Sequence, residues 1–330
     1  MTKNETNIDD LMTGNAPSTL RMVTSQQPVI KYNELDKVHF RLLMPLNKYR
    51  IAVGGLRTKG LYKTGLTNKP LISAITIVFN GEKYLEDTIL SVLKQTYDNV
   101  EYIIIDGGSS DGTLDIIKKY DDQLDYWISE KDEGIVDAFN KGISLCTGEI
   151  IGIINADDWY SVDAFEKVAH CNKQPAVICG NVQYWDNYKK DYIYTTNISG
   201  LPREMTINHP AVFIYKNIYK EFGSFDQNYK YAMDYELLLR FYKKGVKFMQ
   251  IDSVLSNMRL GGISDVNWTN SFNEVRLAKI QHGESFLVAF FYYIKQIIRK
   301  KIAYLLSSMG LELVVKFYRD KLSIMKKYKS

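Results

Sequence analysis

The stretch ITIVFNGEKYLEDTILSVLKQTYDNVEYIIIDGGSSDGT (residues 75–113) decides the fold class of this chain. It continues a near-continuous β-branched run over 72–79, which is typical of a strand buried on both faces of a parallel sheet. Residues 82–95 follow as a predicted helix, with one apolar stripe formed by Leu85, Ile89, Val92 and Leu93. Residues 101–105 are a second apolar strand. Strand, helix and strand in this order predict a right-handed βαβ unit.

The same alternation continues to residue 154. We expect a helix over GTLDIIKKY with Asp111 as its N-cap, a strand at 126–129, a helix at 134–146 and a strand at 149–154. This order predicts an α/β fold with a mostly parallel sheet flanked by helices. Beyond residue 176 the pattern changes. There we expect an antiparallel excursion (AVICGNVQYW and DYIYTT), a strand (AVFIY), a helix (YAMDYELLLRFYKKG), and a further strand or strand pair (KFMQIDSVLSNMRL).

The composition divides the chain into three parts. Residues 1–69 are predicted to be a flexible leader, to about residue 30, and then an extension that adds a strand or two. Residues 70–265 form the main domain, and residues 266–330 form a helical tail rich in basic and aromatic side chains.

The bulk numbers limit the classes of protein to consider. A hydrophobic content of 45% and a charged content of 24% are typical of a folded globular protein, and a net charge of +4 over 330 residues argues against a nucleic-acid partner. The three cysteines lack CxxC spacing, which favours a reducing cytoplasm over a disulfide scaffold. No signal peptide is recognised, and the longest apolar run, 286–294, is about half of a membrane span. We therefore expect a soluble or peripheral protein.

Polar side chains follow all four predicted parallel strands. They are Asn80 after the first strand, Asp106 to Gly112 after the second, Glu130, Asp132 and Glu133 after the third, and Asn155 to Asp158 after the fourth. In open α/β sheets, ligands bind outside the carboxyl ends of the strands. Carboxylates that hold a divalent cation, with glycines that let the backbone approach, suit a nucleoside diphosphate. Each residue alone also fits a solvated turn or a helix cap.

Other nucleotide and hydrolase motifs are missing. The first strand is followed by no GxGxxG, which argues against a dinucleotide-binding dehydrogenase, and GxxxxGK[ST] and HExxH do not occur. A nucleotidyltransferase that makes sugar nucleotides would need a basic glycine-rich loop near the first strand, and FNGEKYLE has one glycine and one lysine.

Two stretches resemble a known family. Residues 75–113 look like the opening of the family-2 glycosyltransferases with the GT-A fold, and GIVDAFNKGISLCTGEIIGIINADDWY looks like their segment leading into the DxD motif. This resemblance covers roughly residues 70–265. It implies that Asn80 and Asp106 help hold the nucleoside, with Asp106 bonding the base. It also implies that Asp157, the final position of DxD, ligates Mg²⁺ or Mn²⁺ beside the donor diphosphate.

The resemblance also shows two departures and a candidate base. Asn155 stands where the motif usually has its first Asp, and it is left open whether it binds ribose, metal or nothing. Gly107 stands where the family often has a second Asp, directly after Asp106. The family's acidic motif at the start of a later helix matches Met233 to Glu236, which makes Asp234 the catalytic base and Glu236 a bystander. Without the resemblance, acids in a first helical turn would be read as dipole partners.

For two further features, a purely structural role fits the sequence as well as a functional role does. His209 is either structural or a contact to substrate or diphosphate. Gly261 to Ser264 resemble a loop that closes over the donor, or a plain turn.

Together these features predict an inverting transfer of a sugar from a nucleotide-sugar, UDP by preference, to a hydroxyl of a glycan or glycolipid. The tail segments SFLVAFFYYIKQIIRKKIAYLLSS and VVKFYRDKLSIMKKYKS suit helices lying in a membrane interface, or packing on the domain or a partner. A lipid-linked acceptor for bacterial surface polysaccharide at the inner face of the cell membrane is the analogy from the family. The alternatives are a non-catalytic sugar-nucleotide-binding or scaffolding protein and a sugar nucleotidyltransferase.

Overall fold

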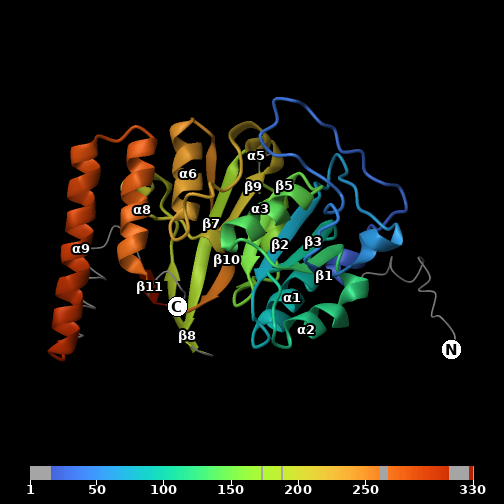
Figure 1. Cartoon of the computed structure of the whole chain (residues 1–330), viewed down its shortest axis with the longest axis horizontal. Coiled ribbons are helices and arrows are strands. Elements are labelled where there is room, and N and C mark those ends of the chain that lie inside the picture. The colour runs from blue at the N-terminus through green and yellow to red at the C-terminus, as the bar shows by residue number, and fades with distance from the viewer. Residues whose placement is uncertain (1–15, 172–173, 187–188, 261–266, 312–326, 330) are drawn as a thin grey trace.

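The computed structural model describes residues 16–171, 174–186, 189–260, 267–311 and 327–329. Its centre is the predicted parallel sheet (Figure 1). The four strands are β2 (Ile72–Val78), β3 (Val100–Asp106), β4 (Tyr126–Glu130) and β5 (Ile150–Asn155), in the order β4-β3-β2-β5 with all pairs parallel. All seven residues of β2 are buried, because helices cover both faces. The predicted α/β fold is confirmed.

The crossover helices match the apolar stripes. They are α1 (Leu85–Leu93), α2 (Thr113–Lys119) and α3 (Ile135–Leu145). Helix α3 packs closely on the sheet at Gly142, where an added Cβ would lie 2.5 Å from the side chain of Ile75. The predicted N-cap of α2 is wrong by one residue, since the N-cap position is Gly112. Asp111 still accepts hydrogen bonds from the Thr113 amide and the Glu82 amide, both at 3.1 Å, and so joins α2 to the start of α1.

The second half extends the sheet with mixed pairing. Its elements are β6 (Trp159–Tyr160), α4 (Ala164–Ala169), β7 (Val177–Asp186), β8 (Lys189–Tyr194), β9 (Val212–Tyr215), α5 (Lys216–Phe222), α6 (Met233–Lys243) and β10 (Phe248–Arg259). Strand β9 runs antiparallel to both β5 and β7, β8 forms the predicted antiparallel pair with β7, and β10 is one bulged strand parallel to β7. Strand β6 closes the sheet against β10.

The N-terminal extension is part of this sheet. Strand β1 (Arg50–Gly54) pairs antiparallel with β4, which confirms the expected added strand, and the 3-10 helix η3 (Leu56–Lys59) follows it. Arg57 in η3 forms a fully buried ion pair with Glu101 of β3. Part of the stretch predicted as leader also packs on the domain, because Ser18 in the 3-10 helix η2 (Ser18–Leu20) is buried and donates to the Val92 carbonyl at 2.7 Å. Three further short 3-10 helices lie outside the extension, η4 (Asp121–Gln123) before β4, and η5 (Ile198–Gly200) and η6 (His209–Ala211) between β8 and β9.

The tail contains α8 (Trp268–Gln281), α9 (Phe286–Ser308) and the short strand β11 (Lys327–Lys329), which pairs with β8. Helices α6, α8 and α9 stand side by side at one end of the sheet (Figure 1). In the described part of the chain, no helix is both long and apolar enough to cross a membrane.

Candidate active site

The rim at the carboxyl ends of β2, β3, β4 and β5 is where the sequence predicts the ligand site. Asn80 lies two residues after the end of β2 and adopts the left-handed backbone conformation, with φ of 52°. Its amide N–H donates to the Ser109 hydroxyl at 2.7 Å and its side-chain carbonyl accepts from the Ser110 amide at 2.9 Å. Asn residues tolerate this conformation better than most, so the residue fixes a turn that links the first two rim loops. Within the described residues, no bond to the carboxamide NH₂ group of Asn80 is present, so this group could serve a ligand.

Asp106, at the end of β3, is fully buried. Its carboxylate accepts hydrogen bonds from the Ser109 amide at 3.2 Å, from the Ser109 hydroxyl, and from the Ser129 hydroxyl at 2.6 Å. Both oxygens are therefore used within the rim itself. In this conformation Asp106 holds the loop together. The nucleobase of a donor could reach its carboxylate only if the loop opened.

Asp132, in the loop after β4, offers the acceptor that Asp106 does not. One oxygen, Oδ1, accepts from the Gly134 amide at 3.0 Å. The other, Oδ2, has no hydrogen-bond partner among the described residues, and it lies where a side chain on residue 107 would stand, since a Cβ added to Gly107 would be 2.5 Å away. Gly107 thus makes room for the carboxylate of Asp132. Burial, and the charges of Asp137 and Asp106, raise the pKa of Asp132, while Lys141 and the bond to Gly134 oppose that rise.

The DxD segment, Asn155 to Asp158, is held from two sides. The Thr88 hydroxyl, in α1, lies 2.9 Å from the Ala156 carbonyl and 2.6 Å from the Asp158 carbonyl, and donates to this pair of acceptors. From β10, the Arg259 guanidinium donates to the Asp157 carbonyl and its amide donates to the Asp158 carboxylate. The backbone of this segment is therefore fixed by side chains distant in the sequence.

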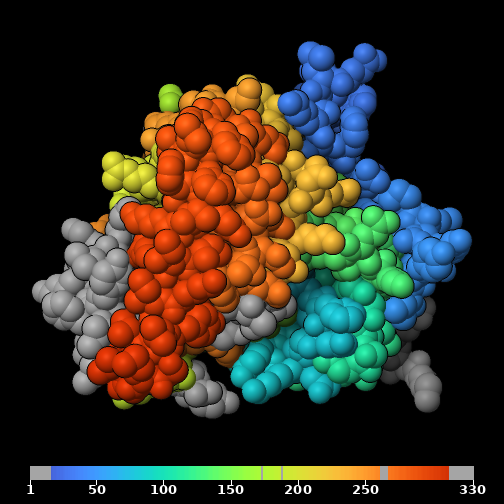
Figure 2. All heavy atoms as spheres, turned by 60° about the vertical axis from the view of Figure 1, so that its left-hand side comes forward, coloured from blue at the N-terminus to red at the C-terminus, as the bar shows by residue number. Residues whose placement is uncertain are grey.

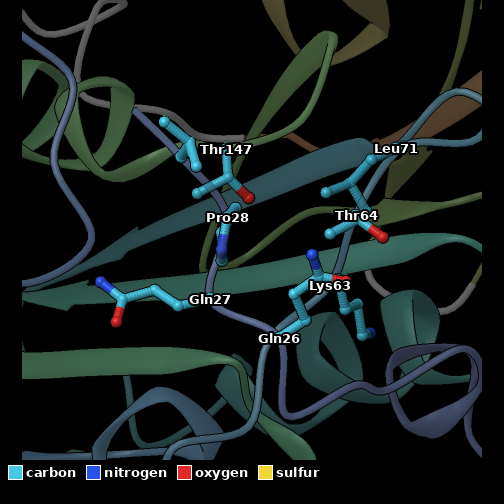
Figure 3. Close-up of a pocket in the computed structure, with 9 residues that line it drawn as sticks. Gln26, Gln27, Pro28, Lys63, Thr64, Leu71 and Thr147 are labelled. Atoms are coloured by element: carbon cyan, nitrogen blue, oxygen red, sulfur yellow. The ribbon is translucent and has the colours of Figure 1, made fainter. Parts of the chain in front are cut away.

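Arg259 is itself held by three neighbours. Its guanidinium pairs with Asp87 at 2.7 Å and lies over the rings of Tyr84 and Trp159, at 4.1 and 4.5 Å from their centroids. This fixed cation borders a groove of about 510 Å³ between α1 and the ends of β6, β7 and β10. A second pocket, of about 360 Å³, lies at the opposite ends of the strands, beside Leu71 before β2 and Thr147 before β5 (Figure 3). It is remote from the rim.

The two acids of the DxD segment differ in environment. Asp157 is exposed and pairs with no Lys, Arg or His in the described chain. Asp158 is buried, and burial, reinforced by the charge of Asp157, raises its pKa well above the usual range. Asp158 is thus a structural acid, and Asp157 is the exposed carboxylate of the segment.

This donor set fits a divalent cation held jointly with a substrate. Within the described residues, no three His, Cys, Asp or Glu side chains converge on one point. Mg²⁺ in nucleotide sites is commonly bound by one or two carboxylates together with substrate phosphates and water. Asp157 supplies such a carboxylate and Asn155, at the end of β5, an amide oxygen.

Asp234 lies in the first turn of α6. One of its oxygens accepts from the Tyr235 amide at 2.8 Å, and no cation pairs with its carboxylate among the residues described. Burial raises the pKa of Asp234 to about 6, with a contribution from Glu274, against the lowering effect of the backbone bonds. Its neighbour Glu236 is buried and bonded to Arg240 at 3.1 Å and His282 at 2.8 Å.

His209 begins η6, which leads into β9 and lies beside β5. Its ring contacts the rings of Phe139 and Phe225, with centroids 5.4 and 5.7 Å away. Burial of the ring lowers the pKa of His209 to about 4, so the side chain is neutral at pH 7. The predicted loop Gly261 to Ser264 lies outside the described residues.

Comparison with known proteins gives the family. The sequence profile of the family described as Glycosyl transferase family 2 matches residues 73–249, more than half of the chain. The chain belongs to this family. An uncharacterized glycosyltransferase of Rickettsia typhi is 32% identical over 193 residues, which are 53% of this chain and 59% of that protein. The chain thus spans less than two thirds of that relative.

Two solved structures share the fold of this family-2 glycosyltransferase. S. aureus TarS (residues 1–349) in complex with UDP-GlcNAc has a TM-score of 0.52 at 16% identity, over 68% of this chain and 70% of that one. The mannosyltransferase PcManGT from Pyrobaculum calidifontis, in complex with GDP-Man and Mn²⁺, has a TM-score of 0.51 at 15% identity, over 75% and 81% of the two chains. At these identities the likeness shows the fold, and it confirms the GT-A architecture.

Proposed function

We propose that this protein is an inverting, metal-assisted glycosyltransferase that moves a sugar from a UDP-sugar to an acceptor hydroxyl. The observation that carries the proposal is Asp234. It is a carboxylate in the first turn of α6 with a pKa raised to about 6 and no cation partner in the described chain. A base with a pKa near the working pH is partly ionised and still accepts a proton readily. Family membership and the exposed Asp157 support the rest.

In this reaction the acceptor oxygen attacks the anomeric carbon while Asp234 takes its proton. The bond between that carbon and the donor diphosphate breaks on the opposite side, and the nucleoside diphosphate leaves with the electron pair. An α-linked donor therefore gives a β product. Asp157, with Asn155, would hold Mg²⁺ or Mn²⁺, which supplies positive charge to the leaving diphosphate. The Mn²⁺ in the PcManGT complex supports this assignment by analogy.

For the nucleoside we propose a division of labour. Asn80 offers its NH₂ group, Asp106 keeps the loop in shape, and Asp132 offers a free carboxylate oxygen next to Gly107. A base N–H or a ribose hydroxyl is the donor that such an oxygen accepts from. His209, being neutral, would donate or accept one hydrogen bond at the diphosphate or the acceptor, without adding positive charge.

For the acceptor we propose a glycan or glycolipid at the inner face of the cell membrane. Support comes from α9, on which large apolar side chains are exposed beside a basic cluster, Arg299 to Lys301. Phe291 is 67% exposed and Leu287 63%. In Figure 2, the residues of α9 form a continuous band on the face turned toward the viewer. Aromatic and basic side chains on one helix suit an anionic lipid surface.

Calorimetric titration tests the donor site. UDP, and GDP for comparison, would be titrated into the wild type and into Asp157→Ala, with and without Mn²⁺. We expect UDP to bind in the presence of Mn²⁺ and to lose most of its affinity on removal of either the ion or Asp157. Equal binding without metal, or no binding of either nucleotide, contradicts the proposal and favours a scaffolding protein. Sedimentation with phosphatidylglycerol vesicles, compared with phosphatidylcholine vesicles, tests the tail.

A further inference from the structure

Helix α8 lies outside the matched family region, yet it holds the segment that leads into α6. The Glu274 carboxylate accepts hydrogen bonds from three successive backbone amides, those of Lys230 at 3.0 Å, Tyr231 at 2.7 Å and Ala232 at 2.8 Å. Ala232 is the N-cap residue of α6, and Asp234 follows two positions later. The N-cap amide has no partner within the helix, so a carboxylate that binds it together with the two amides before it fixes how the chain enters the helix.

We propose that Glu274 positions the catalytic base Asp234 from the tail, so that α8 is a working part of the active site. This inference rests on the proposed function, because it takes Asp234 as the base. A base must hold its carboxylate within hydrogen-bond reach of the acceptor hydroxyl, and small displacements are costly. Among the described residues, the Asp234 carboxylate is bonded to backbone amides of its own turn, such as that of Tyr235 at 2.8 Å. Its position is therefore that of the first turn of α6.

Other contacts make α8 a brace for the same turn. The Tyr229 hydroxyl bonds to Gln281 at 2.6 Å, which ties the preceding loop to the far end of α8. His282, just after α8, bonds to Glu236 at 2.8 Å, on the other side of Asp234. Upstream, Phe225 and Asn140 of α3 exchange two hydrogen bonds, of 2.9 and 3.0 Å. The turn that carries Asp234 is thus held by α8, and the loop that leads to it is anchored to α3 at Phe225.

Glu274 also acts on Asp234 through its charge. After burial, it is the group that raises the pKa of Asp234, because two carboxylates near each other disfavour the ionised form. The other acid of the turn, Glu236, is paired with Arg240 and His282. Replacing Glu274 by a neutral residue should therefore both loosen the turn and lower the pKa of the base.

The test compares Glu274→Gln with Gln281→Ala, which removes a neutral tether from the same helix. Hydrogen exchange of the peptide containing 230–232 reports the turn. Nucleoside diphosphate release from UDP-glucose, UDP-GlcNAc and GDP-mannose with Mn²⁺, measured from pH 4.5 to 8, reports the base. For Glu274→Gln we expect faster exchange at 230–232, a roughly 10-fold lower kcat and an acid limb moved to lower pH. Gln281→Ala should leave the acid limb where it is.

Three results overturn the role of Glu274. One is unchanged exchange at 230–232 in Glu274→Gln, and another is faster exchange with the kcat and acid limb of the wild type. A loss of activity equal in both variants, with no movement of the acid limb, also contradicts it, because that is the signature of general destabilisation. If the wild type turns over none of these donors at any pH, the proposed function fails, and the role of Glu274 fails with it. A wild type that is active confines any failure to Glu274.

Discussion

The two halves of the candidate site are built differently. The donor half, at the ends of β2 to β5, consists of loops that directly follow buried parallel strands, and most of its internal bonds join neighbouring loops, as between Asn80 and Ser110. The proposed acceptor half, around Asp234, lies in a turn held by the tail helix α8, and the loop before that turn is bonded to α3 at Phe225. Loops anchored at the ends of buried strands are held in place by the sheet. A turn made by distant helices depends on their packing, so changes in the acceptor half should affect catalysis more than binding.

Asp234→Asn should give the largest effect and sharpen this contrast most. The carboxamide keeps the shape of the side chain but accepts no proton, and a general base contributes about 10²–10⁴-fold. We expect kcat to fall roughly 10³-fold while UDP affinity stays within about twofold. In the wild type, activity should rise with pH through the pKa of Asp234, about 6, since the ionised carboxylate is the active form. Steady-state kinetics from pH 4.5 to 8 measure both.

The matched control is Glu236→Gln, two positions along the same helix. It breaks the pairs with Arg240 and His282, so we expect a lower midpoint of thermal unfolding. The acid limb should remain near pH 6. If Glu236→Gln abolishes the acid limb and Asp234→Asn does not, the base has been assigned to the wrong carboxylate.

Asp157→Ala should have the next largest effect, and in the donor half. The exposed carboxylate is the one proposed to hold the cation that neutralises the diphosphate, so we expect a loss of roughly 100-fold in UDP affinity with Mn²⁺ present, or about 2.7 kcal/mol. Titration calorimetry measures it, with Asp163→Ala as control, an acid that pairs with Lys167 nearby in sequence. Retained Mn²⁺-dependent binding in Asp157→Ala would move the metal site elsewhere.

The same contrast explains what the sequence could predict. The strands, the order of the helices and the polar rim follow from local patterns, because period and burial are written in consecutive residues. The predicted N-cap of α2, Asp111, is off by a single position, because the exact residue at which a helix begins varies by one or two positions for the same local pattern. The burial of Asp106 depends on Ser129 of the next strand, and the fixing of the DxD segment depends on Arg259. The hydrogen bond between Glu274 and the amide of Ala232, just before Asp234, joins residues 42 positions apart in the sequence. No spacing rule reveals these pairs.

Asp132→Asn should have a smaller effect, and it tests the donor half residue by residue. Loss of a charged acceptor for a nucleoside N–H or hydroxyl costs about 1.5 kcal/mol, or roughly 10-fold in UDP affinity. Glu133→Gln, on the same loop and exposed, is the control and should bind UDP as the wild type does. If Asp106→Asn weakens binding while Asp132→Asn does not, the loop opens on binding and the buried acid makes the base contact.

Arg259→Lys should have the smallest effect, and it is the change most able to break the comparison. Arg259 reaches the DxD segment from β10, so the donor half also depends on one remote side chain. Lysine keeps the charge near Asp87 but loses the planar group that lies over Tyr84 and Trp159 while it donates to the Asp157 carbonyl. We expect a roughly fivefold weaker UDP affinity with Mn²⁺, with kcat nearly unchanged, because the Thr88 hydroxyl still holds the segment. Thr88→Val combined with Arg259→Lys should then cost more than the two single changes added. A 100-fold loss in Arg259→Lys alone would mean that Asp157, the proposed metal ligand, is positioned from a distance, as is proposed for Asp234, and the two halves would be built alike.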